Sequence, residues 1–216
     1  IKNSFENIKF YLLALIVSLS INFLINFLFN SYSALSNLII ISALFLIISS
    51  LFDGFKSFRK NKIDLAQIIS HASFGFLVLF IGLNHIFSIE KDYNIKLGET
   101  KNFDNYTIKL ENIELKNFSN YKAIIGKLII SNIKNEEKNI LKPEIRIYEN
   151  PQTLTYEASI KTSILKDYYL TMSNIDRSEY YNIKFQKKPF MIWIWISVIM
   201  IAFGGFLRLF TNAKNN

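Results

Sequence analysis

The sequence predicts a membrane protein with four transmembrane helices and a small antiparallel all-β domain inserted between the third and the fourth helix. Half of its 216 residues are hydrophobic, although the chain also carries 25 Lys and Arg residues. This mixture indicates that apolar and polar residues are segregated along the chain. Four apolar runs are long enough to cross about 30 Å of hydrocarbon, and the polar residues 90–188 separate the last two.

The apolar runs predict the helices. They lie at residues 8–30, 35–52, 65–89 and 189–210, so that residues 1–89 hold three spans and residues 211–216 form a tail. The first run has no small-residue cleavage site and is followed at once by another span, so it is not a cleaved signal peptide. Because the chain begins with Ile1 and not with Met, we expect it to be part of a longer protein or the product of a split gene.

Charge predicts the orientation of the spans. The loop at residues 53–62 carries four Lys and Arg residues, whereas the loop at residues 31–36 carries no charge. Basic loops remain on the cytoplasmic or matrix side, which puts both ends of the chain inside and residues 90–188 outside. We therefore expect a multi-pass protein of the bacterial inner membrane with a periplasmic β domain, or of the mitochondrial inner membrane. Because basic loops are usual on one side of a membrane protein, the net charge of +8 does not indicate a nucleic-acid partner.

The outer domain reads as strands because short β-branched and aromatic runs recur between turn-like breaks. In Tyr106–Glu111 apolar and polar residues alternate, as a half-buried strand requires. Turns are expected at residues 117–120 and 135–138 and at Asn150-Pro151. The predicted strands, which favour a small barrel or sandwich, are residues 106–115, 121–132, 140–149, 156–161, 168–173 and 180–186.

Few residues can carry chemistry. The chain has no cysteine and two histidines, which excludes covalent heme attachment, so any cofactor is held non-covalently. His71 lies about 9 Å into the third span from its inner end. An ionisable side chain there suggests a functional site, and neutral imidazole is a good iron ligand. From the residues alone, an iron ligand and a hydrogen-bonded packing histidine are equally good interpretations of His71.

Other polar residues are better explained by structure. His85 lies on roughly the same helix face as His71, near the outer end, where histidines are commonly only solvated. Ser18, Asn22 and Asn26 recur every four residues in the first span, and this stripe favours interhelical hydrogen bonds over a substrate path. In the fourth span we expect Trp193 and Trp195 to anchor the helix at the interface, and Gly204-Gly205 to allow close packing.

The outer domain offers carboxylates and bases but no histidine or cysteine to activate a nucleophile. Glu144 and Arg146 are two positions apart on a predicted strand and point the same way, so a surface ion pair is expected. With Glu157 and Asp167 they form no hydrolase constellation, and no phosphate-binding glycine loop is present. The sequence therefore predicts no catalytic residue.

The order of short motifs from about Ile63 to Phe210 resembles the C-terminal third of the CcmF family, the heme lyases of cytochrome c maturation. The motifs are SHASFG at residues 70–75, LGE at 97–99, NYKA at 120–123, LKPEIRIY at 141–148, YEASI at 156–160, KDYY at 166–169, and KPF with WIW and GG between 188 and 205.

The resemblance implies a role in moving heme from the carrier CcmE onto the two cysteine thiols of apocytochrome c at the outer face. It also implies a heme b held by two intramembrane histidines, with His71 at the position of one of them. His85 matches no family histidine. The implied partners are CcmE, apocytochrome c and thiol-reducing maturation subunits.

The family's tryptophan-rich segment, its two outer-face histidines and its other intramembrane histidine precede the region that this chain matches. The second axial ligand must therefore come from outside the chain, and the N-terminal part of the same lyase is an expected partner. Alone, the chain is not expected to be a competent lyase. The alternatives are a non-enzymatic membrane-anchored docking scaffold and, less favoured, a fragment of a transporter.

Overall fold

The structure of the chain, a computed structural model, describes residues 2–29, 33–59, 65–134, 137–174 and 179–213. It forms two compact units, one made of residues Ile1–Phe87 with Pro189–Asn216 and one made of residues Ser88–Lys188. Within these described ranges, four helices build the first unit and ten strands the second, so the predicted fold class is confirmed. Parts of two predicted loops, of one turn and of the tail lie outside the described residues: Ser31, Tyr32, Lys60, Asn61, Lys62, Asn135, Glu136 and Lys214.

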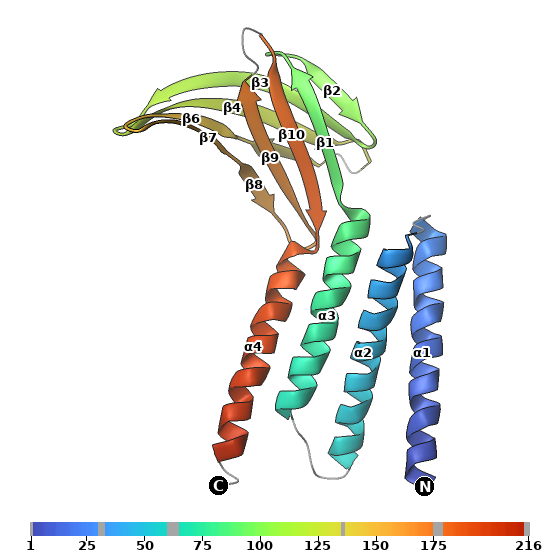
Figure 1. The fold of residues 1–216 in the computed structure, drawn as a ribbon. Helices are drawn as coiled ribbons and strands as arrows, with labels where there is room; N and C mark the ends of the chain where they lie inside the picture. Colours follow the sequence, from blue (N-terminus) through green and yellow to red (C-terminus); the bar gives the residue numbers. More distant parts are fainter. Residues whose placement is uncertain (1, 30–32, 60–64, 135–136, 175–178, 214–216) are drawn as a thin grey trace. The chain divides into compact units, whose positions relative to one another are not determined.

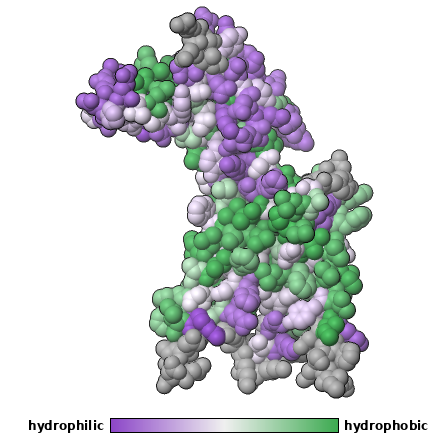
Figure 2. Space-filling model, viewed as in Figure 1, coloured by the Kyte–Doolittle hydropathy of each residue, from purple (hydrophilic) through white to green (hydrophobic). Residues whose placement is uncertain are grey.

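The four helices of the first unit lie side by side (Figure 1). They are α1 (Lys2–Phe29), α2 (Ala34–Arg59), α3 (Leu65–Phe87) and α4 (Met191–Ala213). Each contains a segment that is long and apolar enough to cross a membrane, and Figure 2 shows the apolar residues gathered as a band over the helices. Helix α2 continues beyond the predicted end at Phe52, so Asp53–Arg59 is helical and not loop.

Small residues let the helices approach closely. The helices pack in chain order, α1 on α2, α2 on α3 and α3 on α4. A Cβ atom on Gly75 would lie 2.6 Å from Cγ1 of Ile47 in α2. A Cβ atom on Gly204 of α4 would lie 2.9 Å from the backbone nitrogen of Ser70. Glycine removes the side chain that would hold the helices apart, so α3 is fixed between two neighbours.

The polar stripe of α1 faces α2. Ser18, Asn22 and Asn26 are buried, and the side-chain amide of Asn26 donates a hydrogen bond of 2.8 Å to the Oδ1 atom of Asn37. The prediction that this stripe serves interhelical hydrogen bonding is confirmed for Asn26.

The second unit consists of two antiparallel sheets. One sheet has the strand order β1-β10-β9-β8, and the other β2-β3-β4-β6-β7, with β5 paired to β4. The strands are β1 (Ile89–Ile95), β2 (Thr100–Phe103), β3 (Tyr106–Asn117), β4 (Tyr121–Asn132), β5 (Lys138–Leu141), β6 (Glu144–Glu149), β7 (Gln152–Glu157), β8 (Ser159–Thr162), β9 (Lys166–Asn174) and β10 (Tyr181–Pro189).

The strands differ from the prediction where the sequence signal is mixed. The predicted strand at residues 140–149 is interrupted before β6, because Pro143 has no N–H group to donate to a ladder, although its carbonyl accepts a hydrogen bond of 3.1 Å from Gly126. The predicted strand at residues 156–161 is divided between β7 and β8, which lie in different sheets. Strands β1 and β2 were not predicted. Strand β1 is rich in charged residues and pairs with β10 along its whole length, so tertiary pairing outweighs its weak local preference.

The two sheets enclose one apolar core. Its fully buried side chains include Phe185 and Tyr168 from one sheet and Leu110, Leu128 and Ile145 from the other. Burial of this set stabilises the domain by the hydrophobic effect, and the domain keeps its own core independently of the helices.

The pair Gly204 and Gly205 tests the packing of the helical unit. In Gly204→Ala, the added Cβ would lie 2.9 Å from the nitrogen of Ser70 and 3.1 Å from the carbonyl oxygen of Ala66. We expect a loss of about 1–3 kcal/mol in unfolding free energy and a lower melting temperature in detergent. A Cβ on Gly205 meets no atom within 4 Å, so Gly205→Ala is the matched control. Equal melting temperatures would contradict the α3–α4 contact.

Candidate functional site

His71 projects from the open face of the helix row. It lies six positions after the start of α3 at Leu65. Ala72, Ser73 and Gly75 beside it are buried, whereas the His71 side chain is exposed. Because α2 and α4 occupy the buried sides of α3, the imidazole ring is left between them and accessible from outside this chain.

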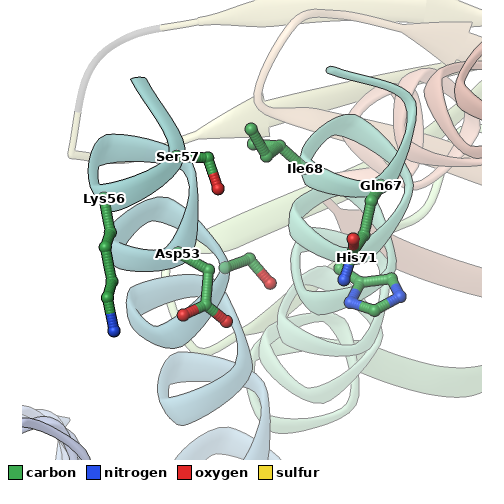
Figure 3. A pocket seen from close by; sticks show the side chains of 7 residues that line it. Asp53, Lys56, Ser57, Gln67, Ile68 and His71 are labelled. Carbon is green, nitrogen blue, oxygen red and sulfur yellow. The ribbon is translucent and has the colours of Figure 1, made fainter. Parts of the chain in front are cut away.

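A polar cavity of about 270 Å³ lies on the α2 side of His71. We call it the Asp53 cavity; its lining is Ser50, Asp53, Lys56, Ser57, Gln67, Ile68 and His71. In Figure 3, Asp53 and Ser57 reach from α2 into the space before α3, and Gln67 lies next to the His71 ring. The hydroxyl of Tyr11 donates a hydrogen bond of 3.1 Å to the Asp53 carboxylate. This cavity therefore combines an acid, a base and neutral polar groups.

A second cavity, of about 290 Å³, lies on the α4 side of His71. We call it the Gly205 cavity; its lining is Ala66, Gln67, Ser70, His71, Gly204, Gly205 and Arg208. The two cavities thus share His71 and Gln67 as lining residues.

The opposite face of α3 carries a third cavity, of about 340 Å³, that is almost entirely apolar. Its walls include Phe76, Phe80, Trp193 and Met200, and the rings of Phe80 and Trp193 stack with centroids 5.7 Å apart. Trp193 therefore packs on α3, whereas Trp195 is 63% exposed. The apolar wall of this cavity offers no imidazole, carboxylate or thiolate that could bind a metal.

His85 does not join His71. It is exposed near the outer end of α3 and lies about 21 Å along the helix axis from His71. One iron cannot contact both rings at that distance. Asn84, its neighbour, donates a hydrogen bond of 2.5 Å to the carbonyl of Pro189 and so ties the end of α3 to the start of α4.

The residues around His71 fit a heme better than a bare metal ion. Among the described residues, no group of three or more His, Cys, Asp or Glu side chains could hold a metal ion. A porphyrin supplies four ring nitrogens itself, so an axial imidazole is the only iron ligand that the chain needs to add. Gly205 lies on the exposed surface of α4, and a Cβ there would meet no atom within 4 Å.

Gln67, Arg208 and the open side of Gly205 were not singled out from the sequence. Gln67 precedes His71 by four positions and therefore lies on the same helix face, which is a signal that could have found it. Arg208 lies two residues before the end of the fourth apolar segment, Met191–Phe210, where a long arginine side chain can reach the interface. The spacing of residues along the sequence does not show that α4 packs near this face of α3.

The β domain contains ion pairs but no catalytic constellation among its described residues. Arg146 Nε donates a hydrogen bond of 2.8 Å to the carboxylate of Glu144, as expected for this pair. Hydrogen bonds of the Arg146 guanidinium, first with the Glu144 carboxylate and then with the side chain of Tyr148, raise the pKa of Arg146. Asp167 is buried at 5% exposure. These described groups do not form a nucleophile with an activating base.

Comparisons with known proteins agree with this architecture. The family model described as "CcmF C-terminal beta-sandwich" matches residues 86–189, which include the whole β domain. The solved structure of the cytochrome c heme lyase CcmF superposes on 89% of this chain with a TM-score of 0.67. At 14% sequence identity, this likeness shows the fold alone.

Curated bacterial proteins show the same relationship in sequence. The chain is 23% identical over 145 residues to the cytochrome c-type biogenesis protein CcmF of Escherichia coli, covering 67% of this chain and 22% of that protein. The CcmF of Haemophilus influenzae is 27% identical over 161 residues, with coverage of 74% and 24%. The protein ccl1 of Rhodobacter capsulatus is 28% identical over 151 residues, with coverage of 70% and 23%.

The chain thus spans less than a quarter of the length of these curated relatives. The β-sandwich match, the matching fold and the bacterial relatives together confirm the resemblance seen in the sequence. In sequence and in fold, with four helices long and apolar enough to cross a membrane and an inserted β-sandwich, this chain is similar to the C-terminal part of the cytochrome c-type biogenesis protein CcmF.

Proposed function

We propose that the chain is the C-terminal portion of a cytochrome c heme lyase and that His71 supplies one axial ligand to a heme b held in the membrane. In this proposal the lyase transfers heme from a carrier to apocytochrome c, and the β domain contributes a receiving surface on the outer face. The observation that carries it is the exposed imidazole of His71, which lines two cavities on a helix face that α2 and α4 leave open.

The chemistry of the chain's own residues supports the ligand assignment. Neutral imidazole offers a nitrogen lone pair to iron. Gln67, next to His71 in Figure 3, is a neutral hydrogen-bonding group that can orient the ring or a polar edge of the cofactor. When bound, the heme supplies the redox chemistry of its iron, and the chain supplies a donor atom and a shaped wall.

The open face of the helix row also supports a site shared with another polypeptide segment. The chain has two histidines, and His85 is too far along α3 to contact the iron that His71 would bind. Neither histidine of this chain is therefore available as the second ligand. A second axial ligand from the N-terminal part of the lyase would cover the exposed His71 ring. The resemblance to the CcmF family suggests heme b as the cofactor. It also suggests the carrier CcmE, apocytochrome c and the thiol-reducing subunits as partners.

Replacing His71 tests the ligand role. In membranes that contain the complete lyase, His71→Ala should remove most of the b-type heme absorbance, because the iron loses an axial bond. Added imidazole should restore part of the spectrum by filling the vacated position. Reduced-minus-oxidised difference spectra measure both effects.

His85→Ala is the matched control, since it removes a histidine from the same helix and should leave the heme spectrum unchanged. Full heme retention in His71→Ala would refute the ligand assignment. A wild-type complex without any b-type heme would favour the alternative in which the chain is a docking scaffold.

The orientation of the β domain can be measured independently, because the chain has no native cysteine. We expect Ser119→Cys, in the exposed turn between β3 and β4, to react with a membrane-impermeant maleimide in intact cells. Lys9→Cys, near the first residue of the α1 span, should react only after the membrane is permeabilised. The reverse pattern would place the β domain inside and would remove the basis for heme attachment at that domain.

A further inference from the structure

We propose that the turn between strands β8 and β9 inserts its two apolar residues, Ile164 and Leu165, into the surface of the lipid bilayer. The turn then holds the β domain at the membrane at a third point, besides the two chain connections to α3 and α4. This inference is independent of the heme ligand and of the side of the membrane on which the β domain lies.

The tip of this turn differs in composition from the other tight turns of the domain. The backbone N–H of Ser163 donates a hydrogen bond of 3.1 Å to the carbonyl of Lys166, so Ile164 and Leu165 alone form the tip. Such turns favour Gly, Asn, Asp, Ser and Pro, each for a backbone reason. Three other two-residue tips follow this preference, namely Asp104-Asn105, Ser119-Asn120 and Asn150-Pro151. Turn chemistry therefore gives no reason for an apolar pair between β8 and β9.

Both side chains at this tip are exposed. Ile164 is 67% exposed and Leu165 is 62% exposed, and neither belongs to the apolar core between the two sheets. A single exposed apolar side chain is ordinary on a protein surface, whereas adjacent ones that project together mark a surface for interaction. The pair is thus suited to an apolar environment outside the β domain.

The turn lies at the end of its sheet where the chain leaves for a membrane span. The strand order is β1-β10-β9-β8, and β8 and β10 point toward the same end of this sheet (Figure 1). At that end, β10 finishes at Pro189, two residues before the apolar segment Met191–Phe210. The ammonium group of Lys188 lies 5.3 Å from the centre of the Tyr169 ring, so the first residues of β9 lie beside the last residues of β10. The turn is therefore one to two strand spacings, about 5–10 Å, from the end of β10.

The occupant that this position favours is lipid. Because β10 ends two residues before a membrane span, this end of the sheet reaches the headgroup region, where apolar side chains partition into the boundary of the acyl chains. Lys161 on β8 is exposed, and Lys187 and Lys188 lie near the end of β10. Lysine side chains at such a boundary extend toward lipid phosphates. A protein partner would not require the apolar pair to lie at this end of the sheet, whereas a bilayer does.

The position of the turn gives the contact a mechanical consequence. The two chain connections leave the domain through neighbouring strands, β1 and β10, in which Ile89 is paired with Lys187. Two adjacent connections fix a line about which a domain can rock. Strand β8 lies two strands beyond β10, so a contact at its end is displaced from that line. Insertion of Ile164 and Leu165 therefore limits the tilt of the β domain relative to the membrane.

Fluorescence quenching by spin-labelled lipids tests the inference in the complete lyase, reconstituted into nanodiscs. This chain has no native cysteine, so a bimane probe on Leu165→Cys reports on the turn once cysteines elsewhere in the lyase are replaced. Phospholipids with a doxyl group near the headgroup end of the acyl chain should quench this probe roughly three-fold more than the same probe on Ser119→Cys, at the tip between β3 and β4. The same probe on Ile164→Cys should be quenched as strongly as the one on Leu165→Cys.

A second variant separates insertion of the pair from mere proximity to lipid. Ile164→Ser, added to the labelled Leu165→Cys protein, should lower the quenching, because the tip loses half of its apolar surface. Thr162→Ser changes an exposed residue at the end of β8 and should leave the quenching unchanged. Both replaced side chains are exposed, so the melting temperature should stay the same. Equal quenching at Leu165 and Ser119 would overturn the inference. A blue-shifted bimane emission at Leu165 without quenching by the lipids would also overturn it, since protein and not lipid would then cover the tip.

Discussion

The close approach of α3 to its two neighbours is the constraint on which the site depends. Gly75 allows α2 to touch α3, and Gly204 allows α4 to touch it from the other side. With both flanks fixed, α3 can rotate little about its axis, and His71 is held on the face that remains open. In lipid, where apolar surface alone gives helices little reason to associate, such small-residue contacts are the main source of specific packing.

The β-sandwich follows a different physical rule. Its two sheets bury a core of aliphatic and aromatic side chains, and all members of this core lie in the β domain. The hydrophobic effect therefore drives its formation, as in a soluble domain. It is joined to the membrane unit at both ends, through Ser88 after α3 and through Lys188 before α4. The helix that carries His71 is thus followed directly by the first strand of the β domain.

The sequence predicted the elements with strong periodicity and missed those that depend on distant partners. The apolar spans, strand β4 and the Glu144–Arg146 pair could be read locally. The charged strand β1 could not, because it exists through its pairing with β10. At the site, the helix position of His71 was predicted, whereas its place in the walls of two cavities depends on how α2 and α4 pack against α3, and that packing is not encoded in residue spacing.

The central claim is that the imidazole of His71 contacts the heme iron, and exchange of the ligand atom tests it most directly. In a His71→Met lyase, the iron should acquire a thioether sulfur as an axial ligand. The account predicts a sulfur-to-iron charge-transfer band in the near-infrared magnetic circular dichroism spectrum and a higher midpoint potential, since methionine ligation raises the potential of heme. A bis-histidine spectrum that is unchanged from the wild type would contradict the account.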